Sequence, residues 1–288
     1  MKEPVFFLNG EFLPRSEARI SPEDRGFLLS DGVYEVAPFY DGSPFALREH
    51  LDRLASGIEW MRIPYDVSRL AGVPGELVRR NGIADAPTAL VYLQVTRGAA
   101  PRTHFFPPEP VEPTVFGYAK AWDRPEADRW EQGFSAVTVP DLRWGRVDIK
   151  TVSLLPNVLA FQRALDLGAD DALLVRDGIA IEGAHQNFWG VFDGTAVTHP
   201  LTANILPGVT RRLVLELASE AGVPCSERPI AVEEIELADE LFFTGTTGEI
   251  RPCTEVDGKM VGDGMTGEVT RKLSRLFRAH VERTATGG

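Results

Sequence analysis

The chain has 288 residues, of which 43% are hydrophobic, and a formal net charge of −12. Its length allows one large domain or two modest ones. The acidic balance argues against nucleic acid or an anionic membrane surface as the main partner, because both require a basic footprint. No apolar run approaches a membrane-spanning length, so we expect no membrane-spanning segment.

The cysteines and the N-terminus indicate the compartment. Cys225 and Cys253 are far apart in the sequence and match neither a disulfide framework nor a Cys/His metal site. The five histidines also lack metal-binding spacing. Residues 1–12 have neither the long apolar core nor the cleavage site of a signal peptide. We therefore expect a reduced, cytoplasmic protein without a structural metal.

Tight turns recur along the chain as Asn-Gly or Asp-Gly pairs between apolar or β-branched runs. Both residues of such a pair tolerate the positive φ angles that two-residue hairpins require. The pairs are Asn9-Gly10, Asp41-Gly42, Asp177-Gly178, Asp193-Gly194 and Asp257-Gly258. They predict that much of the protein is antiparallel sheet.

Helical periodicity interrupts this pattern at four places. Apolar residues recur there at intervals of three and four, which is the repeat of one helix face. The predicted helices cover residues 47–61, 155–168, 210–221 and 266–283. The third of them opens at Thr210 and stops near Gly222, where valine and proline follow.

A charged stretch with a proline, residues 119–133, has no sustained apolar repeat. We interpret it as the boundary between two domains of an α+β protein. The predicted small α+β domain covers residues 1–119, the linker residues 120–133, and the larger domain residues 134–288.

Lys150 is the lysine whose surroundings differ most from a solvated surface. It follows the strand-like run RVDI and precedes an apolar segment, so its amine would be partly desolvated and nucleophilic. The alternative is a surface lysine paired with Asp148. Position alone favours this alternative, because most lysines lie at surfaces.

Glu182 lies between two hairpin signals, where Ile179 and Ile181 would share one strand face. A carboxylate there could pair with the protonated nitrogen of a pyridine ring and so help the ring to accept electrons. A surface glutamate at the end of a loop is the alternative.

Two segments have the character of anion sites. Residues 206–211 open a helix, where backbone N–H groups and the Thr210 hydroxyl could bind phosphate. Residues 244–248, TGTTG, follow a strand-like run and would let backbone approach a phosphate closely. A simple helix cap and a polar turn are the respective alternatives.

Two further basic sites could bind anions. Arg53 lies one turn from His50 on the first helix, as a phosphate ligand or as half of a structural ion pair. Arg102 and His104 would point to the same side of an extended segment and could clamp a carboxylate. An exposed loop with incidental basic residues is the alternative for this second pair.

Several runs, taken in order, resemble a known family over nearly the whole chain. They are PEDRGFLLSDGVYEV (22–36), EHLDRL (49–54), QVTRG (94–98), PRTH (101–104), RVDIK (146–150), IEG (181–183), LPGVTR (206–211), ELFFTGTTGEI (240–250) and DGMTGEVTRKL (263–273). Together they resemble the fold-type IV pyridoxal-phosphate enzymes, and most closely the D-amino acid aminotransferases. The resemblance implies a small α/β domain, a larger domain with an antiparallel-rich, barrel-like sheet and flanking helices, and a homodimer.

The resemblance also implies roles for individual residues. Lys150 would form the Schiff base with pyridoxal 5′-phosphate and move the substrate proton, and Glu182 would pair with the pyridine nitrogen. The residues that would bind the coenzyme phosphate are Arg53, Val209, Thr210 and Thr246. Those that would bind or surround the substrate are Tyr34, Thr247, Arg143 and, from the neighbouring subunit, Arg102 and His104.

The implied reaction is transamination of D-amino acids such as D-alanine or D-glutamate with 2-oxoglutarate or pyruvate, through pyridoxamine phosphate. Branched-chain L-amino acid aminotransferase, aminodeoxychorismate lyase and (R)-amine transaminase are the alternatives on the same fold. The chain departs from the family pattern at Ala184-His185-Gln186, where a serine-rich stretch is common, and at Gly245, where a serine is often found. These departures bear on coenzyme tuning and substrate range.

Overall fold

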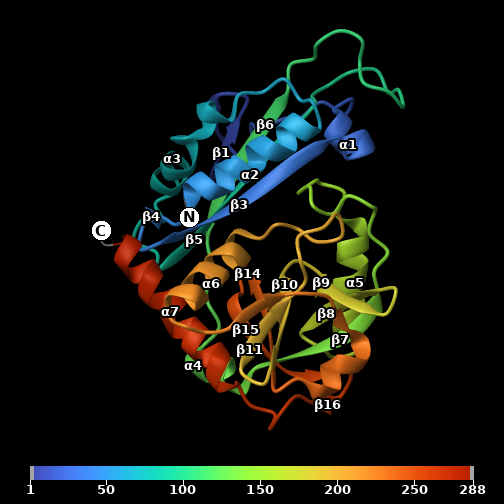
Figure 1. Ribbon diagram of the computed structural model, residues 1–288. Helices are drawn as coiled ribbons and strands as arrows, with labels where there is room; N and C mark the ends of the chain where they lie inside the picture. The colour runs from blue at the N-terminus through green and yellow to red at the C-terminus, as the bar shows by residue number, and fades with distance from the viewer. Residues whose placement is uncertain (1–2, 286–288) are drawn as a thin grey trace. The chain divides into compact units, whose positions relative to one another are not determined.

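The computed structural model describes residues 3–285, which form two compact units (Figure 1). Among the described residues, unit 1 contains those up to Asp123, the short segment Ile149–Ser153 and residues 283–285. Unit 2 contains Arg124–Asp148 and Leu154–Glu282. Within residues 3–285, no helix combines the length and the apolar character needed to cross a membrane.

Unit 1 is built on an antiparallel six-stranded sheet with the order β2-β1-β6-β5-β3-β4. Its strands are β1 (Val5–Leu8), β2 (Glu11–Pro14), β3 (Gly32–Tyr40), β4 (Ser43–Pro44), β5 (Thr88–Thr96) and β6 (Thr114–Ala121). β3 and β5 pair along their full nine residues, which makes them the rigid centre of the sheet.

Helices cover one face of this sheet (Figure 1). They are α2 (Leu47–Trp60) and α3 (Val73–Arg80), with the 3₁₀ helix η1 (Val67–Leu70) between them in the chain, while the short helix α1 (Arg25–Leu29) precedes β3. Leu54 of α2 and Leu77 of α3 pack with Val33, Val91 and other apolar strand residues in one buried core. Because side chains alternate along a strand, Glu35 shares the buried face with Val33, while Tyr34 points to the opposite face.

Unit 2 holds a ten-stranded sheet with the order β12-β11-β10-β14-β15-β7-β8-β9-β13, and β16 pairs with β15. The strands are β7 (Phe134–Pro140), β8 (Asp171–Arg176), β9 (Ile179–Gly183), β10 (Asn187–Phe192), β11 (Thr195–Thr198), β12 (Cys225–Glu227), β13 (Ile230–Ala231), β14 (Glu240–Gly245), β15 (Glu249–Val256) and β16 (Lys259–Met260). A further pairing of Asn187 with Glu182 joins β10 to β9 and closes six of these strands into a ring.

The helices that follow β6 along the chain are α4 (Ala127–Gln132), α5 (Leu155–Asp166), α6 (Val209–Glu220), the 3₁₀ helix η2 (Val232–Leu237) and α7 (Glu268–Ala285). α5 connects the parallel strands β7 and β8 and buries Ala160 and Ala164 against them. α6 packs on β14 and buries Leu213, Val214 and Leu217.

The structure confirms the predicted α+β architecture with a barrel-like sheet, and it confirms all five turns. Each Asn-Gly or Asp-Gly pair joins two antiparallel strands, and both residues of every pair have positive φ angles. The four predicted helices correspond to α2, α5, α6 and α7, with ends that differ by at most two residues.

Two local features differ from the prediction. The expected linker contains the short helix α4. Its Trp130 is buried and packs edge-on against Phe134, with 5.5 Å between the ring centroids. The segment that carries Lys150 belongs to unit 1, although we expected it in the larger domain. The cause is a short backbone ladder, in which Thr151 forms a β-bridge with Val33 of β3.

Candidate active site

Lys150 lies beside β3 and is half-buried. Its carbonyl accepts a hydrogen bond of 3.0 Å from Tyr34 N, and its Nζ lies 4.4 Å from the centroid of the Tyr34 ring. The backbone bond and the contact between ammonium and ring together orient the lysine. Asp148, which the sequence offered as an ion-pair partner for Lys150, instead accepts two hydrogen bonds of 2.9 and 2.8 Å from Arg146.

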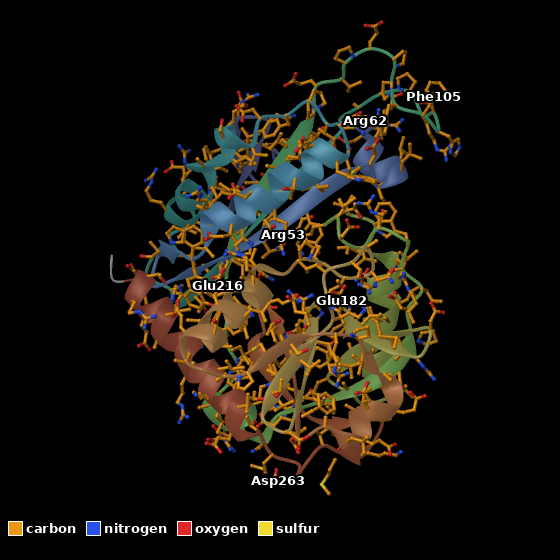
Figure 2. All side chains as sticks on the ribbon, viewed as in Figure 1. Arg53, Arg62, Phe105, Glu182, Glu216 and Asp263 are labelled. Carbon is orange, nitrogen blue, oxygen red and sulfur yellow. The ribbon has the colours of Figure 1, made fainter. Side chains whose placement is uncertain are left out.

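Arg53 projects from α2 and is bound by a buried carboxylate of β3 (Figure 2). Its Nε and Nη2 donate to the two carboxylate oxygens of Glu35 at 2.8 and 2.7 Å, and His50 Nδ1 lies 3.1 Å from the same group. Burial by itself raises the pKa of Glu35, but Arg53 and His50 outweigh it and hold that pKa well below its ordinary value of 4.5. Arg53 is therefore a cation with a fixed orientation, as a phosphate ligand should be.

Tyr34 belongs to a stack of tyrosines on the face of the sheet opposite the helices. Its ring centroid lies 5.5 Å from that of Tyr92, which lies 5.2 Å from that of Tyr118. Burial, together with the neighbouring tyrosines, raises the pKa of Tyr92 far above its ordinary value of 10.0. The stack supports the Tyr34 ring from the side of the sheet.

Arg102 and His104 lie in the loop between β5 and β6 of unit 1, and both are exposed. Within residues 3–285, neither side chain has a hydrogen-bond or ion-pair partner. The residue between them is held, because Arg25 Nη1 donates to the carbonyl of Thr103 at 3.1 Å. The two basic side chains therefore flank a residue, Thr103, whose carbonyl is held by a hydrogen bond.

Glu182 lies on β9 with 4% of its surface exposed (Figure 2). Its carboxylate accepts hydrogen bonds from Arg143 Nη1, from Asn187 Nδ2 at 2.9 Å and from Leu206 N at 3.2 Å. Burial raises the pKa of Glu182 above 4.5, although Arg143 and the Leu206 amide oppose this shift. Arg143 is itself held by Asp141, with two bonds of 2.9 Å. The result is a buried, well-oriented hydrogen-bond acceptor.

Asn187 connects Glu182 with both segments that were predicted to bind an anion. In the sheet it pairs with Glu182 on one side and with Thr244, the first residue of the TGTTG run, on the other. Its Nδ2 also donates to the Leu206 carbonyl at 2.9 Å. Gly208 must be glycine here, because a Cβ at that position would lie 2.0 Å from Asn187 Oδ1. The start of α6, the end of β14 and Glu182 therefore meet around one asparagine.

The predicted phosphate ligands of unit 2 lie at a helix start and in a turn. Val209 and Thr210 are the first residues of α6, whose N-cap Gly208 provides no side-chain cap. First-turn amides have no partner within a helix, so they favour an anion. Thr246 and Thr247 are half-buried in the turn between β14 and β15.

Glu35, Asp141 and Asn187 hold predicted site residues in place, and the sequence alone did not reveal them. Each acts through a partner, and no local pattern discloses which partner that is. One signal was present for Glu35: a charged residue in alternation with Val33 on a buried strand face requires a partner. Asn187 offered a weaker signal, as a polar residue at the start of the apolar run FWGVF.

Comparison with known proteins agrees with this geometry. Residues 32–256 match the amino-transferase class IV family. The chain is 40% identical to the D-alanine aminotransferase of Staphylococcus haemolyticus over 279 residues, which is 96% of this chain and 97% of the relative. It is 38% identical to the enzyme of the same name from Bacillus licheniformis, covering 94% of each chain.

Solved structures give the same family. The branched-chain amino acid aminotransferase of Escherichia coli superposes with a TM-score of 0.90 at 28% identity, covering 96% of this chain and 94% of that one. A second branched-chain amino acid aminotransferase, from the organism abbreviated T.th. and solved with pyridoxamine 5′-phosphate, superposes with a TM-score of 0.88 at 26% identity, covering 98% and 95%.

The chain belongs to the class IV aminotransferases. It is accordingly a fold-type IV transferase that depends on pyridoxal phosphate. The donor chemistry of each unit fits this coenzyme. Unit 1 offers a primary amine at Lys150 and a fixed guanidinium at Arg53, and unit 2 offers a buried carboxylate at Glu182 and the first-turn amides of α6.

Proposed function

We propose that this enzyme transaminates D-amino acids, D-alanine and D-glutamate among them, with 2-oxo acids such as 2-oxoglutarate or pyruvate as acceptors. The observation that carries this proposal is the 40% identity to a D-alanine aminotransferase over 96% of the chain. The two basic side chains of Arg102 and His104 support it, since they suit a substrate that bears a carboxylate.

Four residues would hold the phosphate of the coenzyme. Arg53 would supply a guanidinium whose direction Glu35 fixes, and Val209 and Thr210 would supply amides and a hydroxyl at the start of α6. Thr246 would add a hydroxyl from the turn after β14. These contacts would anchor the coenzyme while the amine at Lys150 is released and recaptured.

Glu182 would hold a proton at the pyridine nitrogen. When bound, pyridoxal phosphate delocalises the negative charge that forms at the substrate Cα when its proton is removed. A protonated ring does this best, and the ionised carboxylate of Glu182 would accept a hydrogen bond from the pyridinium N–H and stabilise its positive charge. Arg143, Asn187 and the Leu206 amide would keep that carboxylate in place.

Lys150 would bind the coenzyme covalently and then act as the base. Its amine, once displaced by the substrate amino group, would take the proton from Cα and return it on the coenzyme side. Tyr34 would keep this amine oriented through its ring contact. One proton donor and acceptor would thus serve both half-reactions.

Tyr34, Thr247, Arg102 and His104 would bind the substrate carboxylate. In this proposal Arg102 and His104 act in the neighbouring subunit of a homodimer, so the dimer is the active form. This arrangement would favour amino acids over simple amines, which lack the carboxylate.

Branched-chain L-amino acid transamination is the second candidate function. The observation in its favour is the superposition on the Escherichia coli branched-chain enzyme with a TM-score of 0.90. The identity of that pair is 28%, lower than the 40% with the D-alanine enzyme. We therefore place the D-amino acid function first.

A panel of amino donors with 2-oxoglutarate tests the proposal. We expect kcat/KM for D-alanine to exceed that for L-leucine and for (R)-1-phenylethylamine by about a hundredfold or more. Preference for L-leucine would establish the branched-chain function instead. Release of pyruvate from aminodeoxychorismate without an acceptor would identify a lyase and overturn the proposal.

A further inference from the structure

A buried cluster of three charged side chains lies beneath the loop that carries Arg102 and His104. Its members are Arg25, Asp31 and Arg97, whose exposed fractions are 3%, 7% and 5%. Asp31 Oδ2 accepts from Arg25 Nε and from Arg97 Nε, each at 2.8 Å, and Asp31 Oδ1 accepts from Arg97 Nη2 at 3.0 Å. Two guanidinium groups therefore share one carboxylate inside unit 1.

Each arginine also donates to backbone carbonyls. Arg97 Nη2 donates to Met61 O at 2.7 Å, and its Nη1 donates to Arg62 O at 3.0 Å, at the end of α2. Arg25 Nη1 donates to the carbonyl of Thr103 at 3.1 Å. Asp31 thus orients both guanidinium groups, and one of them reaches the loop.

The loop has a second attachment to the same cluster. The ring of Phe106 covers Arg97, with 3.7 Å between Arg97 Cζ and the ring centroid, and Arg62 approaches the same ring at 5.3 Å. Thr103 Oγ1 also donates to the Phe105 carbonyl at 2.9 Å, which tightens the turn between the two attachments. The loop is exposed, but its main chain is held at residue 103 and its ring at residue 106.

We propose that Arg25, oriented by Asp31 and Arg97, is a positioning residue that fixes the Thr103 carbonyl and thereby directs Arg102 and His104 toward a substrate carboxylate. This inference rests on the proposed function, because it assigns the two basic residues to carboxylate binding. Arg102 and His104 flank the fixed carbonyl in sequence, so a rotation of the main chain at residue 103 displaces both. Discrimination between amino acids and simple amines then depends on a residue that does not touch the substrate.

The Arg25→Lys substitution is the most direct test, because lysine keeps the charge but cannot bind Asp31 and Thr103 O in the same fork geometry. We expect the KM for D-alanine to rise about tenfold, with kcat changed less than about threefold, while the KM for (R)-1-phenylethylamine stays constant. Phe106→Leu should likewise raise the ratio of the KM for D-alanine to the KM for (R)-1-phenylethylamine. Phe106→Tyr, which keeps a ring over Arg97, should leave this ratio at the wild-type value. Arg79→Lys, at an exposed arginine of α3 paired with Glu76, is the matched control.

Hydrogen exchange provides a readout that does not depend on any substrate. In Arg25→Lys the amides of residues 102–106 should exchange about tenfold faster than in the wild type, while those of β3 and β5 keep their protection. Faster exchange with an unchanged ratio of the two KM values would overturn the positioning role. Unchanged exchange would overturn the attachment itself. If the wild type prefers L-leucine or the amine, the proposed function fails, and the exchange result alone then decides whether Arg25 fixes the loop.

Discussion

Glu35 and Glu182 are both buried, yet their surroundings act on them in opposite directions. The pKa of Glu35 is lowered because Arg53 and His50 outweigh the effect of burial. The pKa of Glu182 is raised because burial outweighs Arg143 and the Leu206 amide. The first carboxylate therefore stays ionised and orients a cation, whereas the second is suited to sharing a proton with a ligand.

The lowered pKa of Glu35 predicts how stability depends on pH. The ionised carboxylate contributes stability that is complete above the unfolded pKa near 4.5 and is lost as the pH falls through the depressed folded value. Glu35→Gln should lower the free energy of unfolding at neutral pH by about 3 kcal/mol, because Arg53 loses its counter-charge. Below about pH 5 the variant should lose stability less steeply than the wild type.

Denaturant unfolding between about pH 3 and pH 7 measures both effects. Glu17→Gln, at an exposed glutamate of unit 1, is the control and should reproduce the wild-type profile. An acid limb of equal steepness in Glu35→Gln and the wild type would show that folding leaves the pKa of Glu35 unchanged, and would contradict the prediction.

At the scale of elements, the turn between β14 and β15 depends on the residue that precedes β10. Gln186 is buried, and its Nε2 donates to Asp171 at 2.7 Å. Its side chain lies under the turn, so that a Cβ at Gly245 would meet Gln186 Cγ at 3.0 Å and a Cβ at Gly248 would meet Gln186 Oε1 at 2.0 Å. The glutamine thus takes up the space that a side chain at residue 245 would need.

This packing predicts a coupled pair of substitutions. Gly248→Ala should lower the free energy of unfolding by about 1–3 kcal/mol, because the added methyl group overlaps the buried glutamine. In a Gln186→Ala background the same change should cost less than about 0.5 kcal/mol. Gly145→Ala is the control, since a Cβ there meets no atom within 4 Å. Equal costs of Gly248→Ala in both backgrounds would contradict the proposed packing.

Local structure was largely predictable from the sequence, because local interactions determine it. The five turn pairs require positive φ angles, and the four apolar repeats require a helix face, so both patterns identified their elements. Closure of the barrel at Glu182 and Asn187 was not predictable, because it depends on a single pair of residues outside the regular ladders. The ion pair of Arg53 with Glu35 was missed because its two residues are 18 positions apart, on different elements.

At the scale of the whole molecule, each of the two units contains some of the predicted site residues. Unit 1 contains Lys150, Tyr34 and Arg53, and unit 2 contains Glu182, Thr210 and Thr246. The segment with Lys150 leaves unit 2 for five residues and forms its backbone bonds with β3. The sequence could not assign this segment to unit 1, because five residues are too few to show the alternation of apolar and polar side chains that identifies a strand.

Covalent trapping of the coenzyme tests the central assignment most directly. The purified holoenzyme would be reduced with borohydride, digested and analysed by mass spectrometry, so that the lysine bound to the coenzyme is identified among the five in the chain. We predict that the adduct lies on Lys150 and that the Lys150→Ala variant, which should still fold because the lysine is half-buried and not a core residue, carries none. An adduct on any other lysine of the wild type, or none at all, would contradict the assignment.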